Sequence, residues 1–145
     1  MKHINPIRVY YDNTDAGGIV YHGQYLNFAE RSRTEFLRHA GFENSAIHHG
    51  RGVMFVVRHI EIDYLAPAYL DDILHVETTI REIRSSSFIM HQRIVRPDSG
   101  NPKAEQAVIA DMRVGLVSVD TKTVRPVRLP EDVKSSFQKY LDVIE

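Results

Sequence analysis

The feature that most constrains this chain is a change of hydrophobic period, from about 3.6 residues to about 2, near residue 52. Before the change, apolar or small side chains recur every three or four residues, which predicts one long amphipathic helix over Gln24–Ala40. The stripe consists of Tyr25, Phe28, Ala29, Ser32, Phe36, Leu37 and Ala40. Gly41 follows directly and is suited to end that helix.

Alternating residues after position 52 predict four strands, and one more strand precedes the helix. The expected strands are Ile7–Tyr11, Val53–Tyr64, Ile73–Ile83, Phe88–Val95 and Gln106–Val119. Residues 42–52 are expected to be irregular, residues 96–102 to form a hairpin loop, and a last helix to run from Glu131 to about Val143. Consecutive strands joined by short turns favour an antiparallel sheet, so the expected class is α+β, with the helix stripe covered by one sheet face.

Composition narrows the classes of protein that this chain can belong to. Its 145 residues predict a single domain over 1–145. The 18 basic and 19 acidic residues give a net charge of -1, which argues against nucleic acid as a partner. The absence of Cys excludes disulfides, thiolate metal sites and Cys nucleophiles. Without a long apolar run, we expect no transmembrane segment and a cytoplasmic location.

The segment from Asp12 to Tyr25 is the richest in chemical groups. It contains two carboxylates, the glycine pair Gly17-Gly18, and then Tyr21 and His22 before the start of the helix. Backbone N–H groups at a helix N-terminus polarise a carbonyl oxygen, and a nearby carboxylate attacks that carbonyl or activates water. From composition alone, a solvated turn that caps the helix is the favoured interpretation of this segment.

Other chemistries fail on spacing. A calcium loop that begins at Asp12 would need Glu at position 23, where Gly23 stands. No Lys follows the glycines as in a phosphate loop, and no G-x-S-x-G motif supports a Ser hydrolase. The eight His show no metal-ligand spacing, so we expect neither metal nor cofactor. The turn at residues 81–87 is either a phosphate contact or an ordinary polar hairpin turn.

Residues 8–25, RVYYDNTDAGGIVYHGQY, resemble the signature of the 4-hydroxybenzoyl-CoA thioesterase family. Within that family the chain is most similar to the Tol-Pal-associated acyl-CoA thioesterases of the YbgC type. The resemblance continues through residues 28–37, 55–58, 64–72 and 92–95, which together extend over most of the chain. It implies the hotdog fold, a curved antiparallel sheet of about five strands wrapped around one long helix.

The resemblance also implies roles for individual residues. Asp15 matches the catalytic carboxylate, and Gly23 lies where the family's backbone donor meets the thioester oxygen. His22 matches a histidine usual in the YbgC type and is expected to position substrate or water. Tyr21 and Tyr25 are expected substrate contacts beside them.

At the CoA end, the matching turn of the family is strongly basic. At the matching positions of this chain only Arg84 keeps a charge, and Ser85, Ser86 and Ser87 replace the rest. Arg84, Ser85 and Ser86 are the expected contacts for the substrate nucleotide, and acyl carrier protein stays open as the alternative thiol carrier. Because the family's site lies between subunits, a homodimer or homotetramer is implied.

The predicted function is therefore hydrolysis of small acyl-CoA thioesters, either short-chain or aromatic. The first alternative is a non-catalytic partner, or one directed at acyl carrier protein, in lipid metabolism. A hotdog dehydratase or hydratase is a further alternative, which the arrangement around Asp15 fits less well.

Overall fold

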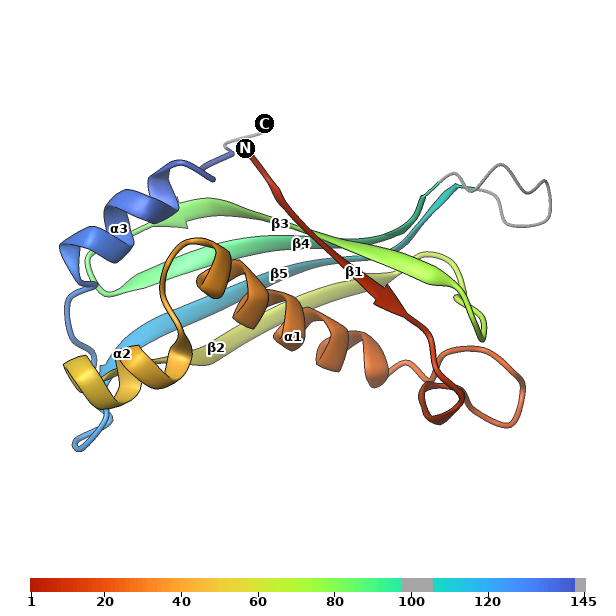
Figure 1. The fold of residues 1–145 in the computed structure, drawn as a ribbon, viewed down its shortest axis with the longest axis horizontal. Coiled ribbons are helices and arrows are strands. Elements are labelled where there is room, and N and C mark those ends of the chain that lie inside the picture. Colours follow the sequence, from red (N-terminus) through yellow and green to blue (C-terminus); the bar gives the residue numbers. More distant parts are fainter. Residues whose placement is uncertain (98–105, 143–145) are drawn as a thin grey trace.

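A five-stranded antiparallel sheet curves around the long helix α1 (Gln24–His39) in the computed structural model, which describes residues 1–97 and 106–142 (Figure 1). The sheet order is β1-β3-β4-β5-β2, formed by β1 (His3–Arg8), β2 (Val53–Tyr64), β3 (Ile73–Ile83), β4 (Ser87–Arg96) and β5 (Ala107–Asp120). Two shorter helices, α2 (Asn44–Arg51) and α3 (Glu131–Gln138), lie at the end of the sheet away from the start of α1. The expected α+β class, with a sheet wrapped around one helix, is confirmed.

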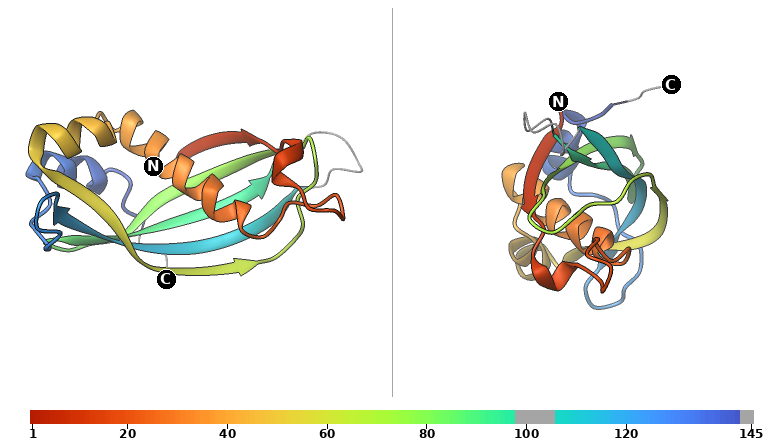
Figure 2. Two further views of the ribbon diagram at one scale, coloured as in Figure 1. Left: turned by 90° about the horizontal axis from the view of Figure 1, so that it is seen from below. Right: turned by 90° about the vertical axis from the view of Figure 1, so that its right-hand side faces the viewer.

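Register shifts give the sheet its curvature. One lies between Val57 and His59 of β2, and another between Ile80 and Glu82 of β3. Such bulges bend a strand and increase its twist. Figure 2 shows the outcome, a sheet whose concave side encloses α1.

The core lies between α1 and the concave face of the sheet. The predicted helix stripe is buried there except for Ala40, which is half-buried at the C-cap, and Phe28 and Phe36 are at most 1% exposed. The predicted inward face of β3 is also buried, and it consists of Leu74, Val76, Thr78 and Ile80. Burial of one helix stripe against one sheet face therefore provides most of the apolar contact in the described chain.

A polar contact inside this core fixes α1 on the sheet. Gln92 of β4 is fully buried, and its side-chain amide donates to the Ala29 carbonyl at 3.1 Å and to Thr78 Oγ1 at 3.2 Å. Its carbonyl oxygen accepts from Arg33 Nη1 at 2.9 Å. Burial lowers the pKa of the Arg33 guanidinium, and the nearby Glu30 carboxylate opposes that shift.

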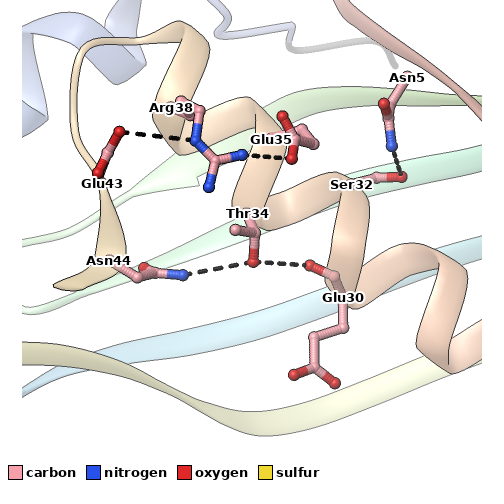
Figure 3. Close-up of polar contacts among 8 residues, drawn as sticks. All are labelled: Asn5, Glu30, Ser32, Thr34, Glu35, Arg38, Glu43 and Asn44. Carbon is pink, nitrogen blue, oxygen red and sulfur yellow. Dashed lines mark hydrogen bonds and ion pairs between the residues drawn. The ribbon is translucent and has the colours of Figure 1, made fainter.

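Polar contacts along α1 join it to its neighbours (Figure 3). Asn5 of β1 donates to Ser32 Oγ at 3.0 Å. On the α2 side, Asn44 donates to Thr34 Oγ1 at 3.4 Å, and Arg38 forms ion pairs with Glu35 and Glu43.

Helix α3 covers the far end of the core with an aromatic cluster. Phe137 is fully buried, with its ring centroid 4.9 Å from that of Phe88 and 5.6 Å from that of Phe36. After the helix, the Tyr140 carbonyl accepts from the Ile80 N–H at 2.9 Å, beside the bulge in β3.

Three boundaries differ from the predictions. The first strand was expected over Ile7–Tyr11 but spans His3–Arg8, since Pro6 lies in an edge strand, where a missing N–H is tolerated. The irregular segment 42–52 contains α2, with Ile47 buried. The last helix ends at Gln138, before the expected Val143, and the predicted 96–102 loop lies mostly outside the described residues.

The first prediction concerns His3, whose ring packs 5.2 Å from the His39 ring and 6.0 Å from the Phe36 ring. Burial, and then His39, lower the pKa of His3 from 6.5, and Glu35 opposes them. The native chain therefore binds fewer protons than the unfolded chain as pH falls below 6.5, so stability present above that pH is lost on acidification. Urea unfolding should show a smaller loss from pH 7.5 to 5.5 in His3→Gln than in the unmodified chain.

The same substitution at His49, which is exposed on α2, is the control. An equal loss of unfolding free energy in His3→Gln and in the unmodified chain would show that His3 is not a source of the pH dependence.

Candidate active site

Asp15 lies at the tip of a short hairpin loop that precedes α1. Its N–H donates to the Ile19 carbonyl at 2.9 Å, and its carbonyl accepts from Gly18 at 3.1 Å. Gly18 has a φ of 81°, the left-handed conformation that favours glycine at the end of such a loop. The Asp15 Oδ1 atom accepts from the Gly17 N–H at 2.8 Å, which orients an exposed carboxylate.

Asn13 connects this loop to the start of the helix, and sequence reasoning did not single it out. Its buried side chain accepts from the Tyr10 N–H at 2.8 Å and donates to Gln24 Oε1 at 3.0 Å. Its carbonyl accepts from the Tyr21 N–H at 3.0 Å. Asn13 therefore sets the base of the Asp15 loop against the first residues of α1.

The N-terminus of α1 is left without a side-chain cap. Gly23 is the N-cap residue and Gln24 donates to the Tyr21 carbonyl at 2.9 Å. Within the described chain, the N–H groups of His22 and Gly23 have no hydrogen-bond acceptor. These two donors, with the positive end of the helix dipole, form an arrangement that polarises a carbonyl oxygen.

An apolar cavity of about 310 Å³ opens beside these donors. Its walls include His22, Tyr25 and the 64–67 segment, with Tyr64 at the end of β2. The Tyr64 ring centroid is 6.1 Å from that of His22 and 5.8 Å from that of Tyr25. The structure thus gathers His22, Gly23 and Tyr25 at the helix start. The Tyr21 ring packs against that of His22 at a tilt of 43°, with the ring centroids 4.4 Å apart.

The hydroxyl of Tyr25 reaches the backbone on the other side of this cavity. It accepts a hydrogen bond from the Ala68 N–H at 3.3 Å. Burial is the main cause that raises the pKa of Tyr25 above 10.0, so the hydroxyl is neutral at physiological pH.

The predicted nucleotide-binding turn lies at the opposite end of the molecule (Figure 1). Arg84 is exposed there and forms an ion pair with Glu82 at 3.2 Å. The turn borders a depression of about 190 Å³, to which Arg128 and Lys134 also contribute. The sequence analysis did not identify these two cations as part of the site, because nothing in residues 81–87 indicates that a segment about 40 residues later packs against that turn. The Ser85 carbonyl accepts from the Leu129 N–H at 2.8 Å and brings that segment in, while the Ser86 carbonyl accepts from Ser118.

Other features of the described residues do not point to a ligand of different chemistry. A larger cavity of about 600 Å³ lies between β1 and the outer side of α1, but its lining is mainly polar. No group of three or more metal-ligating side chains occurs within residues 1–97 and 106–142. The same part of the chain contains no helix long and apolar enough to cross a bilayer.

Comparison with known proteins identifies the family of this chain. The model of the thioesterase-like superfamily matches residues 9–137. An acyl-CoA thioester hydrolase, YbgC of Escherichia coli, is 42% identical over 92% of this chain and 94% of its own. The Haemophilus influenzae YbgC acyl-CoA thioesterase is 39% identical over 91% of each chain. The crystal structure of a probable thioesterase from Bartonella henselae, 35% identical, matches 90% of this chain and 100% of its own with a TM-score of 0.80.

The fold and these matches therefore define a hotdog protein of the thioesterase class. This chain belongs to the thioesterase-like superfamily, next to the YbgC acyl-CoA thioester hydrolases. The hotdog fold and the thioester hydrolase class expected from the sequence are confirmed at the level of the family.

The second prediction concerns Gly17. A Cβ atom there would lie 3.2 Å from Asp15 Oδ1, closer than side chains ordinarily pack, so Gly17→Ala displaces the carboxylate. Displacement of a catalytic group by part of an ångström is costly, so with Asp15 in the catalytic role that the sequence predicts, we expect kcat for thioester hydrolysis to fall about tenfold. Chemical unfolding should change by less than about 1 kcal/mol.

Gly50→Ala is the matched control, because a Cβ on Gly50 in α2 meets no atom within 4 Å. It should leave kcat unchanged and stabilise α2 by up to about 1 kcal/mol. Full activity in Gly17→Ala would show that the position of the Asp15 carboxylate is not critical.

Proposed function

We propose that the protein hydrolyses the thioesters of small acyl groups with CoA, with Asp15 as the catalytic carboxylate. The observation that carries this proposal is the joint placement of three features at one end of α1. These are the exposed Asp15 carboxylate, the unoccupied N–H groups of His22 and Gly23, and an apolar cavity of about 310 Å³. The relatives named acyl-CoA thioester hydrolases support the substrate class.

The reaction follows from these groups. The thioester carbonyl oxygen accepts from the N–H groups of His22 and Gly23, which stabilise the oxyanion as the carbonyl is attacked. Asp15 either attacks that carbon to form a mixed anhydride, which water then hydrolyses, or removes a proton from the attacking water. In both routes a C–O bond replaces the C–S bond, and the thiolate leaves and takes up a proton. His22 positions the substrate or the water.

Cavity size supports a small acyl group. At about 310 Å³ the cavity beside His22 is at the lower end of the range for ligand pockets, about 300–1,000 Å³. A second cavity of about 260 Å³ lies further along α1, between Arg33 and the β2 residues Phe55 and Val57. Short-chain and aromatic acyl groups both fit the first cavity, and longer chains would need the second.

The carrier end of the substrate is assigned to the depression formed by Arg84, Arg128 and Lys134, together with Ser85 and Ser86. Three cations against one carboxylate in the lining, Glu131, suit the phosphates of CoA better than Arg84 alone. An acidic acyl carrier protein is the alternative ligand for the same cations. Cytoplasmic localisation stays a prediction.

A second copy of the chain completes this arrangement. The depression and Asp15 lie at opposite ends of one chain, so one substrate reaches both only if they come from different subunits. Next to the site, Tyr21, Tyr64 and Leu65 expose large apolar surfaces on or near the edge strand β2. Exposed apolar surface beside a sheet edge favours burial against a partner, and we propose a homodimer, or a homotetramer built from dimers.

The third prediction is that Asp15→Asn loses activity. Thiol release from a panel of acyl-CoAs should fall by about three orders of magnitude or more, while the circular dichroism spectrum is unchanged, since Asn keeps the shape but neither attacks nor accepts a proton. Asp12→Asn, three residues earlier and also exposed, is the control. No turnover by the folded unmodified protein with any CoA ester would shift support to carrier-protein thioesters or to the non-catalytic alternative.

A single turnover in ¹⁸O-labelled water tests for the anhydride. Label incorporated into Asp15 requires an anhydride that water opens at the Asp15 carbon, whereas label found only in the product acid means that water attacks the acyl carbon, in the thioester or in the anhydride.

The fourth prediction tests the carrier site. Arg128→Gln should raise KM for an acyl-CoA about tenfold and leave kcat unchanged, since phosphate contacts bind the substrate away from the reacting bond. The matching acyl-pantetheine lacks the nucleotide and is the control substrate, whose KM should not change. Equal KM values for the CoA ester in both proteins would remove Arg128 from the CoA site.

A further inference from the structure

Asp72 and Arg96 form a largely buried ion pair near the Asp15 loop. Arg96 ends β4, and its Nε and Nη2 atoms both donate to Asp72 Oδ2, at 3.1 and 2.9 Å. The side chains are only 12% and 16% exposed. A charged side chain withdrawn from water is costly unless its partner stays in contact with it. The two side chains therefore hold each other in place.

The same two side chains hold the conformation of the 67–72 turn. Arg96 Nη2 donates to the Pro67 carbonyl at 2.9 Å, and Asp72 Oδ2 accepts from the Tyr69 N–H at 2.9 Å. Arg96 also lies 5.6 Å above the centre of the Tyr69 ring. Asp71 in this turn has a φ of 70°, an unfavourable conformation that persists where the surroundings impose it.

The 67–72 turn supports both halves of the proposed site through one residue, Ala68. Its carbonyl accepts from the Val20 N–H at 2.9 Å, and Val20 pairs with Thr14 at the base of the Asp15 loop. The Ala68 N–H donates to the Tyr25 hydroxyl, in the first turn of α1. The backbone of Ala68 thus lies between the Asp15 loop and the helix whose N-terminus bears the carbonyl-polarising donors.

We propose that the Asp72–Arg96 pair is a positioning device for thioester hydrolysis. By fixing Ala68, it sets the position of the Asp15 carboxylate relative to the N–H groups of His22 and Gly23. This role rests on the proposed function, since it requires that Asp15 is the catalytic carboxylate. Because neither side chain of the pair lines the carrier depression, and the pair acts on the position of Asp15 relative to the N–H donors, its main effect falls on kcat rather than KM.

Arg96→Lys and Asp72→Asn are the variants that test this, as the fifth prediction. Lys keeps the charge but cannot reach Asp72 and Pro67 together, and Asn keeps the shape but loses the charge. We expect kcat to fall about 10- to 100-fold in each variant, with KM within about twofold of the unmodified value. Hydrogen exchange should accelerate at the amides of Val20 and Ala68, which are tied to the turn.

Two controls separate positioning from general stability. Arg51→Lys makes the same substitution in the Arg51–Asp132 ion pair, which joins α2 to α3 at the other end of the molecule, and it should leave kcat unchanged. Ile47→Val removes a buried methylene from α2 and lowers the melting temperature without touching the turn. If Arg96→Lys or Asp72→Asn fails to fold, the double variant Asp72→Asn/Arg96→Gln replaces it. The double variant leaves no unpaired buried charge, so we expect it to fold and to show the same loss of kcat.

The outcomes distinguish this proposal from the proposed function. Full kcat and unchanged exchange in Arg96→Lys, together with an inactive Asp15→Asn, overturn the positioning role alone. Full activity in Asp15→Asn overturns the catalytic assignment, and the positioning role with it. A kcat loss in Ile47→Val equal to that in Arg96→Lys would show that stability, not position, limits turnover.

Discussion

The packing of α1 against the concave face of the sheet is the interaction on which the rest of the structure depends. Most helices in proteins are stable because of such packing rather than because of their own propensity. Here the stripe of α1 is buried, and Gln92 ties its backbone to β4. A helix held in this way needs no side chain to cap its N-terminus, and Gly23 indeed provides none. The N–H groups of His22 and Gly23 consequently have no acceptor within the described chain, and this is where the proposed function places the thioester oxygen.

Because α1 runs along the sheet, the two parts of the proposed site lie at opposite ends of one chain. A helix that runs along the sheet has its N-terminus at one end, while the β3–β4 turn lies at the other. Neither end contains all that a thioester substrate requires, because the carboxylate is near one and the cations are near the other. Two copies in opposite orientations would bring the two ends together, and this accounts for apolar side chains such as Tyr64 and Leu65 exposed at the edge of one chain.

Elements with a strong internal pattern could be predicted from the sequence. The 24–40 stripe gave α1 to within a residue, and alternation gave the four long strands nearly in full. Elements that depend on partners were missed or misplaced. Helix α2 has only eight residues, and its support comes from burial of Ile47 and from the Arg51–Asp132 pair, whose members are 81 residues apart. β1 contains Pro6, which argues against a strand until its edge position is known.

The residues of the proposed site also fall into those that a local sequence pattern predicts and those that depend on distant partners. Asp15, Gly17 and Gly18 lie in one short segment, so a motif could locate the loop and the helix start that follows it. The resemblance to a known family, not composition, favoured catalysis over a plain turn. Asp72 and Arg96 are 24 residues apart and come together only when β3 and β4 pair. Arg128 reaches the Arg84 turn only because Leu129 bonds to Ser85. The groups proposed to react are thus close together along the chain, whereas the charges proposed to position them and to bind the carrier are brought together by the sheet.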